Sequence, residues 1–328
     1  MEKPYYSEND IAHSASIIRD KESKAAFLTI RTDGGWSLYG GVSVEAIDFS
    51  RSIAEGAGSG IFPLTVPDTV RYYFQLITDE GAALLSESQL PMSGGYNYRD
   101  MGGISTVDGH HVKWGKVFRS DDLQKLTDAD LTYLASIPLT TIVDFRSDEE
   151  IQQGADRLPV SVKSHVTLSI SPGNQREIAA RMHTLKSHEA DSLMLEINKQ
   201  LVTSPQSIEQ YRKFFELLQD EKNRPLLFHC SAGKDRTGMA AALFLFSLGV
   251  EENHIITDYL LSNKYLENKY EEYILANPNL KPLFEVKPEF IETGLAQIRK
   301  EHGTIENFLQ HVLHVDLDSM KRMYLDAK

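Results

Sequence analysis

The stretch that decides the fold is His229-Cys-Ser-Ala-Gly-Lys-Asp-Arg-Thr-Gly238, which follows a short apolar run and precedes an expected helix. Five residues separate Cys230 from Arg236, which is enough for one tight loop around a tetrahedral anion. Gly233 permits the loop backbone to turn, so that successive amide groups can point inward and bind the anion. The helix that begins near Arg236 adds the partial positive charge of its first turn. The spacing therefore predicts a phosphate-binding loop between a strand and a helix.

Two side chains of this loop indicate covalent phosphoryl transfer. Amide hydrogens and a nearby guanidinium favour an ionised sulfur, so we expect Cys230 to be a thiolate nucleophile at neutral pH. Arg236 offers a planar fork to two phosphoryl oxygens, a geometry that lysine cannot reproduce. The alternative is a small buried cysteine without reactivity. The charged residues at 234–236 argue against that interpretation, because an apolar site would not be surrounded by them.

The pattern His-Cys-X5-Arg-Thr resembles the active-site loop of the cysteine-based protein tyrosine phosphatases. The fuller sequence of the loop is similar to a bacterial, often exported, tyrosine/dual-specificity subfamily, some members of which also act on phosphoinositides. Four further stretches resemble the same subfamily: Asn97–Gly103, Val117–Ser120, Val143–Ser147 and Glu301–Leu309. The resemblance covers the chain from about residue 96 to its end. It implies an α/β fold, with a central sheet flanked by helices.

The loop and its flanks contain the predicted phosphate-binding residues, which are Ser231, Ala232, Gly233, Lys234 and Thr237. We expect the backbone amides of the loop to hold the equatorial phosphoryl oxygens as charge redistributes. The resemblance to members that accept lipids implies that Lys234 contacts a second phosphate group of the substrate. The alternative is that Lys234 is a solvated charge on the loop. Thr237 either hydrogen-bonds the thiolate or begins the helix. His229 is predicted to tie the loop backbone rather than to exchange protons.

The general acid must protonate the oxygen that leaves phosphorus. The resemblance favours Asp235, inside the loop, for this role and for the later activation of water. Its alternative role is structural, in which it bonds loop amides or pairs with a neighbouring cation. Asp144, at the end of an expected strand, is the second candidate. Asp191 and Asp220 lie within or at the end of helical patterns, so neither is expected to act.

Segments upstream of the loop are predicted to support it. Asn97, Arg99 and Asp100 are expected to brace the loop from a neighbouring segment, and a turn closed by two glycines is a compatible alternative. A structural ion-pair network is expected for three other charged residues, namely Arg119, Arg146 and Glu149. Two histidine pairs, 110–111 and 311 with 314, lack a third ligand, so we predict no metal site and no cofactor.

The first ninety residues show a different pattern. Short runs rich in aromatic and β-branched residues, separated by glycines, occupy 25–30, 36–39, 61–66 and 71–77. Closely spaced strands without helical periodicity predict a small immunoglobulin- or fibronectin-like β-sandwich. The run Gln89-Leu-Pro-Met-Ser-Gly-Gly95 is a plausible boundary. We therefore expect two domains, an all-β domain over residues 1–90 and a phosphatase domain over 91–328, with the first docking a partner or positioning substrate.

Strands alternate with helices after the boundary. A hairpin is expected around Asp108-Gly109 because glycine accepts the positive φ of such turns. Strands are expected over 140–145, 165–170 and 225–229. Helices are expected over 127–137 with Thr127 as N-cap, over 175–220 with a break at Ser204-Pro205, over 236–248, and from 252 onward. This alternation predicts a sheet with helices on both faces.

Charge and cysteine content limit the partners and the compartment. The chain of 328 residues has 34 basic and 47 acidic residues, a net charge of −13. Such a surface repels phosphate backbones, so we expect no nucleic-acid partner, and any phosphate group must be captured locally. The start of the chain is no signal peptide and its longest apolar stretch is too short to span a bilayer. We expect no transmembrane segment and a soluble protein, either exported without its leader or cytoplasmic.

These observations predict a phosphatase that hydrolyses phosphotyrosyl monoesters, and also phosphoseryl or phosphothreonyl ones, through a cysteinyl-phosphate intermediate. A phosphoinositide phosphatase that uses the same loop is the alternative. A sulfurtransferase also uses a cysteine loop, but the helix that opens on Arg236-Thr-Gly238 argues against it. A phosphate-binding module without catalysis is disfavoured because nucleophile and arginine are both present.

Overall fold

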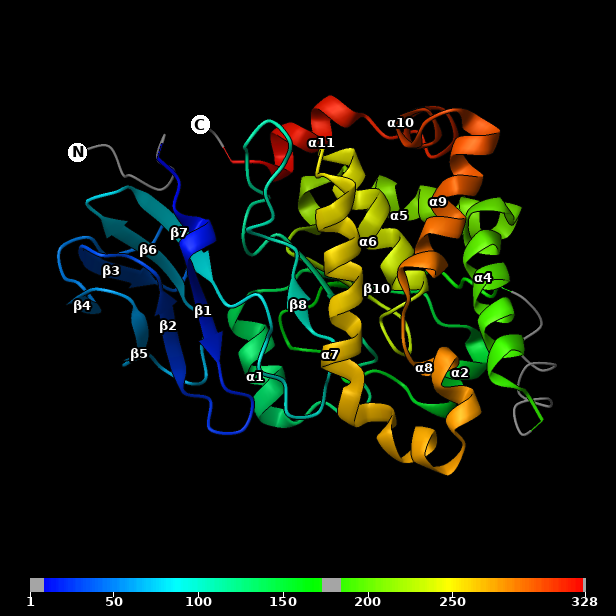
Figure 1. Ribbon diagram of the computed structural model, residues 1–328, viewed down its shortest axis with the longest axis horizontal. Helices are drawn as coiled ribbons and strands as arrows, with labels where there is room; N and C mark the ends of the chain where they lie inside the picture. Colours follow the sequence, from blue (N-terminus) through cyan, green and yellow to red (C-terminus); the bar gives the residue numbers. More distant parts are fainter. Residues whose placement is uncertain (1–8, 173–183, 327–328) are drawn as a thin grey trace.

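The central feature of the molecule is a five-stranded sheet of order β11-β10-β12-β9-β8. The computed structural model describes residues 9–172 and 184–326, and Figure 1 shows the sheet wrapped by helices, with a separate group of strands beside it. The strands of the sheet are β8 Arg99–Asp100, β9 Val117–Ser120, β10 Thr141–Asp144, β11 Ser164–Thr167 and β12 Leu226–His229. All neighbours pair in parallel except β8, which is antiparallel to β9.

The register of the parallel strands brings three chain segments to one edge of the sheet. His229 at the end of β12 pairs with Asp144 of β10 and with Ser120 of β9. Because the carboxyl ends of parallel strands meet at one edge, the residues that follow each strand lie together. The loop that contains Cys230 therefore leaves the middle of the sheet at the position where ligands bind in such folds.

Helices cover both faces of the sheet, as predicted. Alternate side chains of β12 point to opposite faces: Leu226 and Phe228 pack with α5, α6 and α9, whereas Leu227 packs with α1. The longer helices are α1 Asp128–Ser136, α2 Asp148–Gln153, α4 Ser187–Thr203, α5 Pro205–Leu218, α6 Arg236–Ser247, α7 Glu252–Ala276, α9 Pro288–His302 and α11 Leu317–Tyr324. The short ones are η1 Ala12–Ser14, η2 Glu221–Asn223, η3 Pro278–Leu280, α8 Lys281–Phe284, α10 Ile305–Asn307 and η4 Phe308–Val312.

Most helix boundaries agree with the sequence. Thr127 caps α1 by accepting a hydrogen bond from the amide of Asp130 at 3.2 Å, as predicted. The predicted break at Ser204-Pro205 separates α4 from α5. Residues 175–183 of the long predicted helix lie outside the described residues. Over the described part of the chain, no helix combines the length and the apolar character needed to cross a lipid bilayer.

The strands near the N-terminus form two antiparallel sheets, of order β1-β2-β5 and β4-β3-β6-β7. Their bounds are β1 Ala15–Arg19, β2 Ala26–Ile30, β3 Gly35–Gly41, β4 Ala54–Ala57, β5 Gly60–Leu64, β6 Tyr73–Thr78 and β7 Ala82–Ser86. One apolar cluster, which includes Leu28, Trp36 and Phe74, is shared by the two sheets. The sequence predicted β2, β3, β5 and β6 but missed the other three strands.

Two sequence expectations about turns need correction. The glycine-rich run Glu55–Gly60 is one of those expected to separate strands, but its first half belongs to β4. A turn does form at Gly109, where φ is +81°, and backbone hydrogen bonds join residues 103–106 to 110–112 across it, although the paired stretch is too short to count as two strands. The second arm of that expected hairpin ends in β9 and pairs with the central sheet instead, because β12 offers it a fully buried parallel partner.

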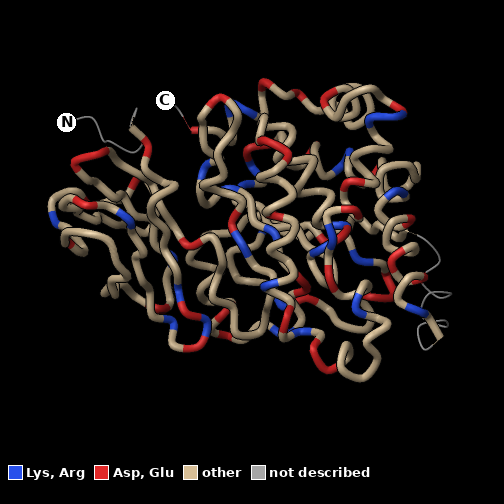
Figure 2. The backbone as a smooth tube through the Cα atoms, viewed as in Figure 1, with Lys and Arg blue, Asp and Glu red and all other residues tan. Residues whose placement is uncertain are grey.

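The N-terminal strands pack directly on the rest of the chain. The indole of Trp114 donates a hydrogen bond to the Leu84 carbonyl at 3.0 Å. Arg71 pairs with Asp100 at 2.8 Å, and both side chains are fully buried. Figure 2 shows acidic and basic positions interspersed along both parts of the chain. The two parts of the chain therefore meet through buried contacts. Because acidic and basic positions are mixed throughout, the positive charge at the Cys230 loop comes from a few local residues.

Candidate active site

The loop from Cys230 to Asp235 connects β12 to α6 and curls around the cysteine sulfur. Cys230 is 2% exposed, and its Sγ accepts a hydrogen bond from the amide of Gly233 at 3.3 Å. Gly233 has a φ of +67°, and a Cβ atom there would lie 2.2 Å from the Ser120 carbonyl oxygen. The turn therefore requires glycine, as the sequence predicted.

Carbonyl groups on the outside of the loop are held by the segments predicted to support it. The Asn97 side-chain amide donates to the carbonyls of Ala232 at 3.1 Å and Gly233 at 3.0 Å. Arg119 donates to the same Gly233 carbonyl at 2.8 Å. Since each peptide unit directs its amide opposite to its carbonyl, outward carbonyls leave the loop amides free to bind an anion.

Behind these contacts lies an ion-pair cluster that the sequence did not predict. Asp258 of α7 pairs with Arg99 at 2.9 Å and with Arg119 at 2.6 Å. Burial alone would raise the pKa of Asp258, but the two guanidinium groups hold it below its ordinary value. Arg99 thus supports the loop indirectly, through Asp258 and through its own hydrogen bond to Asn97.

Arg236 is fixed by a carboxylate that the sequence analysis missed. Its two terminal nitrogens bind the two oxygens of Glu150, at 2.7 and 2.8 Å. The same carboxylate accepts a hydrogen bond from the Ser231 hydroxyl at 2.5 Å. Burial opposes ionisation of Glu150, but its bond to Arg236 lowers its pKa to about 2. Over the described residues the Nε atom of Arg236 makes no hydrogen bond, so it can bind a phosphoryl oxygen.

Asp235 and Lys234 form an ion pair within the loop. The Lys234 ammonium lies 2.7 Å from Oδ2 of Asp235 and donates to the Glu285 carbonyl at 3.3 Å. The other carboxylate oxygen, Oδ1, is buried and has no hydrogen-bond partner in the described part of the chain. One oxygen is therefore held in place while the second is available to a leaving group. The lysine pairing is the structural role considered for Asp235.

His229 lies under the loop and contacts the first loop carbonyl. Its Nδ1 is 3.2 Å from the Cys230 oxygen, and its Nε2 is 3.2 Å from Oδ2 of Asp156. Burial would lower the pKa of His229, but Asp156 and Asp144 raise it above its ordinary value. Asp144 receives four hydrogen bonds from Arg146 and is fully buried. That geometry favours a structural role for the second acid candidate.

The same carboxylates and imidazoles are close enough to coordinate a metal ion. The ligand atoms of Asp144, Asp156, His165 and His229 lie within 4.8 Å of one another. The guanidinium of Arg146 lies 2.8 Å from oxygens of both aspartates. Because this guanidinium already supplies a positive charge between the carboxylates, the donor set does not fit a metal ion well. We assign no metal to the site.

Thr237 and Ser231 complete the loop. The Thr237 hydroxyl is buried and makes no hydrogen bond with the described residues, so it is available to the Cys230 sulfur or to a phosphoryl group. The Ser231 carbonyl accepts a hydrogen bond from Lys269 of α7 at 3.1 Å. Lys269 also pairs with Asp121 at 2.6 Å. No motif in the sequence indicated Lys269, because it lies on a helix far beyond the loop in the chain.

Asp100 does not brace the loop, which corrects the sequence prediction. Its hydrogen bonds with described residues come from the amides of Gly102 and Gly115, each at 2.8 Å, and from Arg71. Burial raises its pKa to about 6, although Arg71 opposes the shift. The alternative of a glycine-closed turn is the one the structure supports, and Asp100 anchors the N-terminal strands.

The predicted network of Arg119, Arg146 and Glu149 is divided in the structure. Arg119 pairs with Asp258, and Arg146 pairs with Asp144 and Asp156, in two separate groups. The carboxylate that reaches the loop arginine is that of the next residue, Glu150.

Aromatic rings lie beside Lys269, whose ammonium donates to the Ser231 carbonyl of the loop. The ammonium lies 5.7 Å from the ring centroid of Tyr96 and 5.8 Å from that of Tyr270. Tyr270 stacks on Phe284 with ring centroids 4.7 Å apart. Burial first, and the charge of Cys230 among other causes, raise the pKa of Tyr270, although Lys269 opposes the shift. Tyr96, Tyr270 and Lys269 therefore form an aromatic cluster beside the loop.

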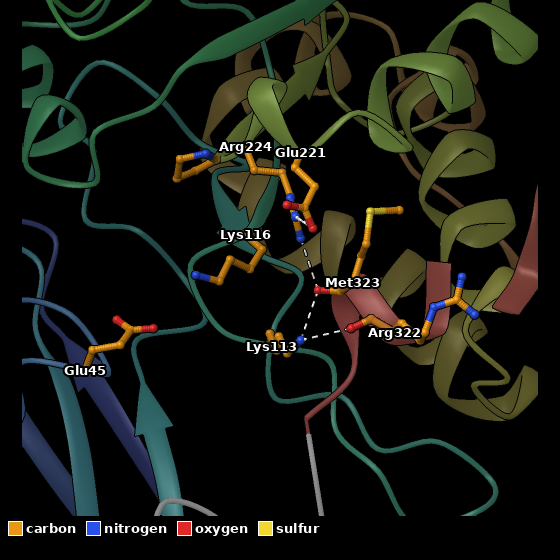
Figure 3. Close-up of a pocket in the computed structure, with 8 residues that line it drawn as sticks. Glu45, Lys113, Lys116, Glu221, Arg224, Arg322 and Met323 are labelled. Atoms are coloured by element: carbon orange, nitrogen blue, oxygen red, sulfur yellow. Dashed lines mark hydrogen bonds and ion pairs between the residues drawn. The ribbon is translucent and has the colours of Figure 1, made fainter. Parts of the chain in front are cut away.

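A cavity of about 420 Å³ lies at the opposite end of β12 (Figure 3). The Lys113 ammonium and the Arg224 guanidinium both bind the Met323 carbonyl there, at 3.1 Å. Arg224 also pairs with Glu221 at 2.6 Å. Figure 3 shows these side chains directed at one another, and the residues that line the cavity include no cysteine. The cavity is therefore separate from the Cys230 loop, which follows the other end of β12.

A cysteine and an arginine on one anion-binding loop, between a parallel strand and a helix, define a cysteine-dependent phosphatase. The model of the tyrosine phosphatase family matches residues 90–326, and the chain belongs to this family. It is therefore a phosphoric monoester hydrolase of the cysteine-based protein tyrosine phosphatase superfamily.

Several named proteins are similar to the chain. A tyrosine-protein phosphatase of Cupriavidus necator is 30% identical over 242 residues, which cover 70% of this chain and 85% of the relative. The triple specificity protein phosphatase PtpB of Mycobacterium tuberculosis is 28% identical over 195 residues, covering 52% and 68%. Among solved structures, the core catalytic domain of the PP-IP phosphatase SIW14 from S. cerevisiae is 13% identical, with a TM-score of 0.29, over 58% of this chain and 97% of that chain.

Proposed function

We propose that the protein hydrolyses phosphotyrosyl monoesters through a cysteinyl phosphate. The Cys230 thiolate attacks phosphorus in line, so that an S–P bond forms and the P–O bond to the phenol breaks. Asp235 gives its proton to the leaving oxygen and later takes a proton from the water that cleaves the S–P bond. Arg236 and the loop amides hold the equatorial oxygens during both steps. The products are the phenol and inorganic phosphate.

The observation that carries this proposal is the position of Cys230 and Arg236 on one loop. The sulfur accepts an inward amide hydrogen, and the guanidinium is held by Glu150 through its two terminal nitrogens, which leaves its Nε atom for substrate. The test is Cys230→Ser, which should abolish hydrolysis of 4-nitrophenyl phosphate while the variant keeps its circular dichroism spectrum. Unchanged turnover would refute the proposal, and activity that is lost on addition of a chelator would count equally against it.

The aromatic cluster of Tyr96 and Tyr270 beside Lys269 supports an aryl phosphate as the preferred substrate. Tyr96 and Tyr270 present half-buried rings beside Lys269, and flat aromatic groups pack well against such rings. Phosphoseryl and phosphothreonyl groups would use the same loop without this contact. We therefore expect a higher kcat/KM for a phosphotyrosyl peptide than for the matched phosphoseryl peptide.

Phosphoinositide hydrolysis is a second candidate, and two largely buried lysines favour it. Lys234 lies in the loop and Lys269 donates to it, so further phosphate groups on a substrate would bind these ammonium groups by displacing their partners Asp235 and Asp121. One relative carries the name triple specificity protein phosphatase. Rates for a phosphotyrosyl peptide and a soluble short-chain phosphoinositide, measured side by side, distinguish the two candidates. Faster turnover of the lipid would make phosphoinositides the preferred substrate class.

We also propose that residues 1–90 form an immunoglobulin- or fibronectin-like β-sandwich domain, and residues 91–328 the phosphatase domain. The apolar cluster shared by the two N-terminal sheets and the start of the family match at residue 90 support this division. The first domain would dock a partner or position substrate. Removal of residues 1–90 should then change substrate preference, whereas a purely structural extension would change only solubility.

A further inference from the structure

The turn between β1 and β2 contacts the segment that precedes the loop-bracing Asn97. In that turn, the Lys21 ammonium donates to the Gly95 carbonyl at 2.7 Å, and the Lys24 ammonium donates to the Ser93 hydroxyl at 2.9 Å and to the Pro91 carbonyl. Figure 1 shows the turn at the lower edge of the molecule, on the same side as the C-terminal end of α7. Two lysines of the N-terminal strands therefore reach the catalytic part near its active-site end.

One of these lysines, Lys21, also lies against an aromatic ring. Its ammonium is 4.3 Å from the ring centroid of Tyr96, and Lys269 lies 5.7 Å from the same centroid. Lys269 in turn donates to the Ser231 carbonyl of the phosphate-binding loop. A continuous series of contacts thus connects the β1–β2 turn to the loop that holds Cys230, and the Tyr96 ring contacts both ammonium groups.

Both contacts of Lys21 restrain the same short segment. The bond to the Gly95 carbonyl fixes the backbone immediately before Tyr96, and the ammonium attracts the face of the Tyr96 ring. The backbone has a second anchor, because the amides of Tyr96 and Asn97 both donate to Oδ1 of Asp121 at 3.0 Å. The Tyr96 backbone is therefore held by the catalytic part, whereas its ring depends in part on the N-terminal strands.

We propose that Lys21 is a positioning residue for aryl phosphate substrates, because its ammonium orients the Tyr96 ring in the aromatic cluster beside the loop. The inference rests on the proposed phosphotyrosyl activity and assigns part of substrate affinity to the N-terminal strands. The aromatic group of the substrate packs against a ring whose orientation Lys21 fixes. The phosphoryl group is bound by the loop and does not depend on Lys21.

Because the ring and the loop bind different groups of the substrate, a change at Lys21 should affect KM but neither kcat nor inhibition by phosphate. Lys21→Met removes the ammonium and keeps most of the side-chain stem. It should raise KM for 4-nitrophenyl phosphate and for a phosphotyrosyl peptide about three- to tenfold, which is part of the combined effect of a cation–π contact and one hydrogen bond. The kcat and the inhibition constant of inorganic phosphate should stay within about twofold of wild type. Lys21→Arg should restore most of the lost affinity.

Two further variants test whether the ring is the cause. Tyr96→Leu should give the same rise in KM, and it serves as the second test if Lys21→Met does not fold. Lys24→Met is the matched control, because Lys24 lies in the same turn and bonds the same segment through Ser93 and Pro91 instead of the Tyr96 ring. Its KM should remain at the wild-type value, and the thermal unfolding of all variants is compared.

Specific results would overturn the proposal. An equal rise in KM for Lys24→Met, or a parallel change in the phosphate inhibition constant, would show a general loss of structure. An unchanged KM in Lys21→Met, with an active wild type, would show that the ring does not depend on Lys21. Failure of the wild type to hydrolyse any aryl phosphate would instead remove the proposed function, and this inference with it.

Discussion

The contact between Glu150 and Arg236 offers the sharpest test of how the loop arginine is oriented. Glu150 occupies both terminal nitrogens of Arg236, which leaves Nε for the substrate. Its carboxylate also accepts the Ser147 amide at 2.8 Å and so completes a capping box at the start of α2. Glu150→Gln removes the charge and retains an acceptor for the cap, since glutamine serves at that position as well.

The magnitude of the effect follows from the two charged contacts. Hydrogen bonds to charged groups contribute about 1.5–3 kcal/mol each, and neutral ones about 1 kcal/mol. The amide can accept from one nitrogen of Arg236 but faces the other with its own donor group. We expect a loss of about 1.5–3 kcal/mol, which lowers kcat/KM about 10- to 160-fold. The inhibition constant of inorganic phosphate should rise by a comparable factor.

The assay compares kcat/KM for 4-nitrophenyl phosphate between pH 5.5 and 8. A carboxylate with a depressed pKa contributes above its ordinary pKa and is lost only as the pH falls through the folded value, here about 2. The ratio of wild type to Glu150→Gln should therefore be constant across this range. Asp148→Asn, an exposed charge change in the first turn of the same helix, is the control and should be neutral.

An opposite result would refute the reasoning about Arg236. If Glu150 competed with substrate for the guanidinium, Glu150→Gln would tighten phosphate binding and raise kcat/KM. That outcome, with the control unchanged, would show that the carboxylate holds the arginine away from the substrate.

Three further predictions test other parts of the molecule. Asp235→Asn should lower kcat/KM, which reports only the transfer of the phosphoryl group to Cys230, about 10²- to 10⁴-fold for phenyl phosphate but far less for 4-nitrophenyl phosphate, whose leaving group needs no proton, and equal losses in kcat/KM would exclude Asp235 as the acid. Gly233→Ala should abolish phosphate binding in a titration, because the new methyl group meets the Ser120 carbonyl at a positive φ, and retained binding would contradict the assigned turn. Hydrogen bonds to Asp10 and Asp326 raise the pKa of His111 to about 9, so the stability lost in His111→Gln, about 1–2 kcal/mol after solvent screening, should be full below pH 6.5 and vanish as the pH rises through about 9. Urea unfolding at pH 6 and pH 9.5 measures that difference, and a constant difference would contradict it.

The sequence predicted the loop well because the loop is local. Cys230, Gly233 and Arg236 lie within seven residues, and the backbone turn that joins them depends on a glycine that no other residue can replace. The helix caps were predictable for the same reason, since Thr127 and its partner Asp130 are three residues apart. Patterns of this kind fix a structure without help from distant parts of the chain.

The residues that orient the loop were harder to predict from the sequence, because they come from distant segments of the chain. Asp258 and Lys269 lie on α7, and their place beside the loop follows from how α7 packs on α6. Glu150 had one usable signal, the spacing Ser147-x-x-Glu150 of a capping box. That signal places a helix start directly after β10, whose carboxyl end adjoins the loop, and so brings Glu150 near Arg236.

Three of the N-terminal strands could not be predicted from the sequence for a different reason. β1, β4 and β7 were missed because their runs are short and carry alanine, glycine or charged residues. Their pairing is decided by neighbouring strands more than by their own composition. Asp100 was misassigned for a related reason. Its motif adjoins Asn97, but its carboxylate turns to the buried Arg71 of the N-terminal part.

The charges around the loop explain how an acidic protein can bind phosphate. Arg236, Lys234 and Lys269 each pair with a carboxylate, so none of these cations is left buried without compensation. An incoming phosphoryl group can bind the loop amides and Nε of Arg236 without breaking any of these pairs. Binding then depends on the shape of the loop more than on net positive charge, which a chain with a net charge of −13 does not have. A variant that unpairs one of these cations should therefore alter the orientation of the loop before it alters the attraction of anions to the protein.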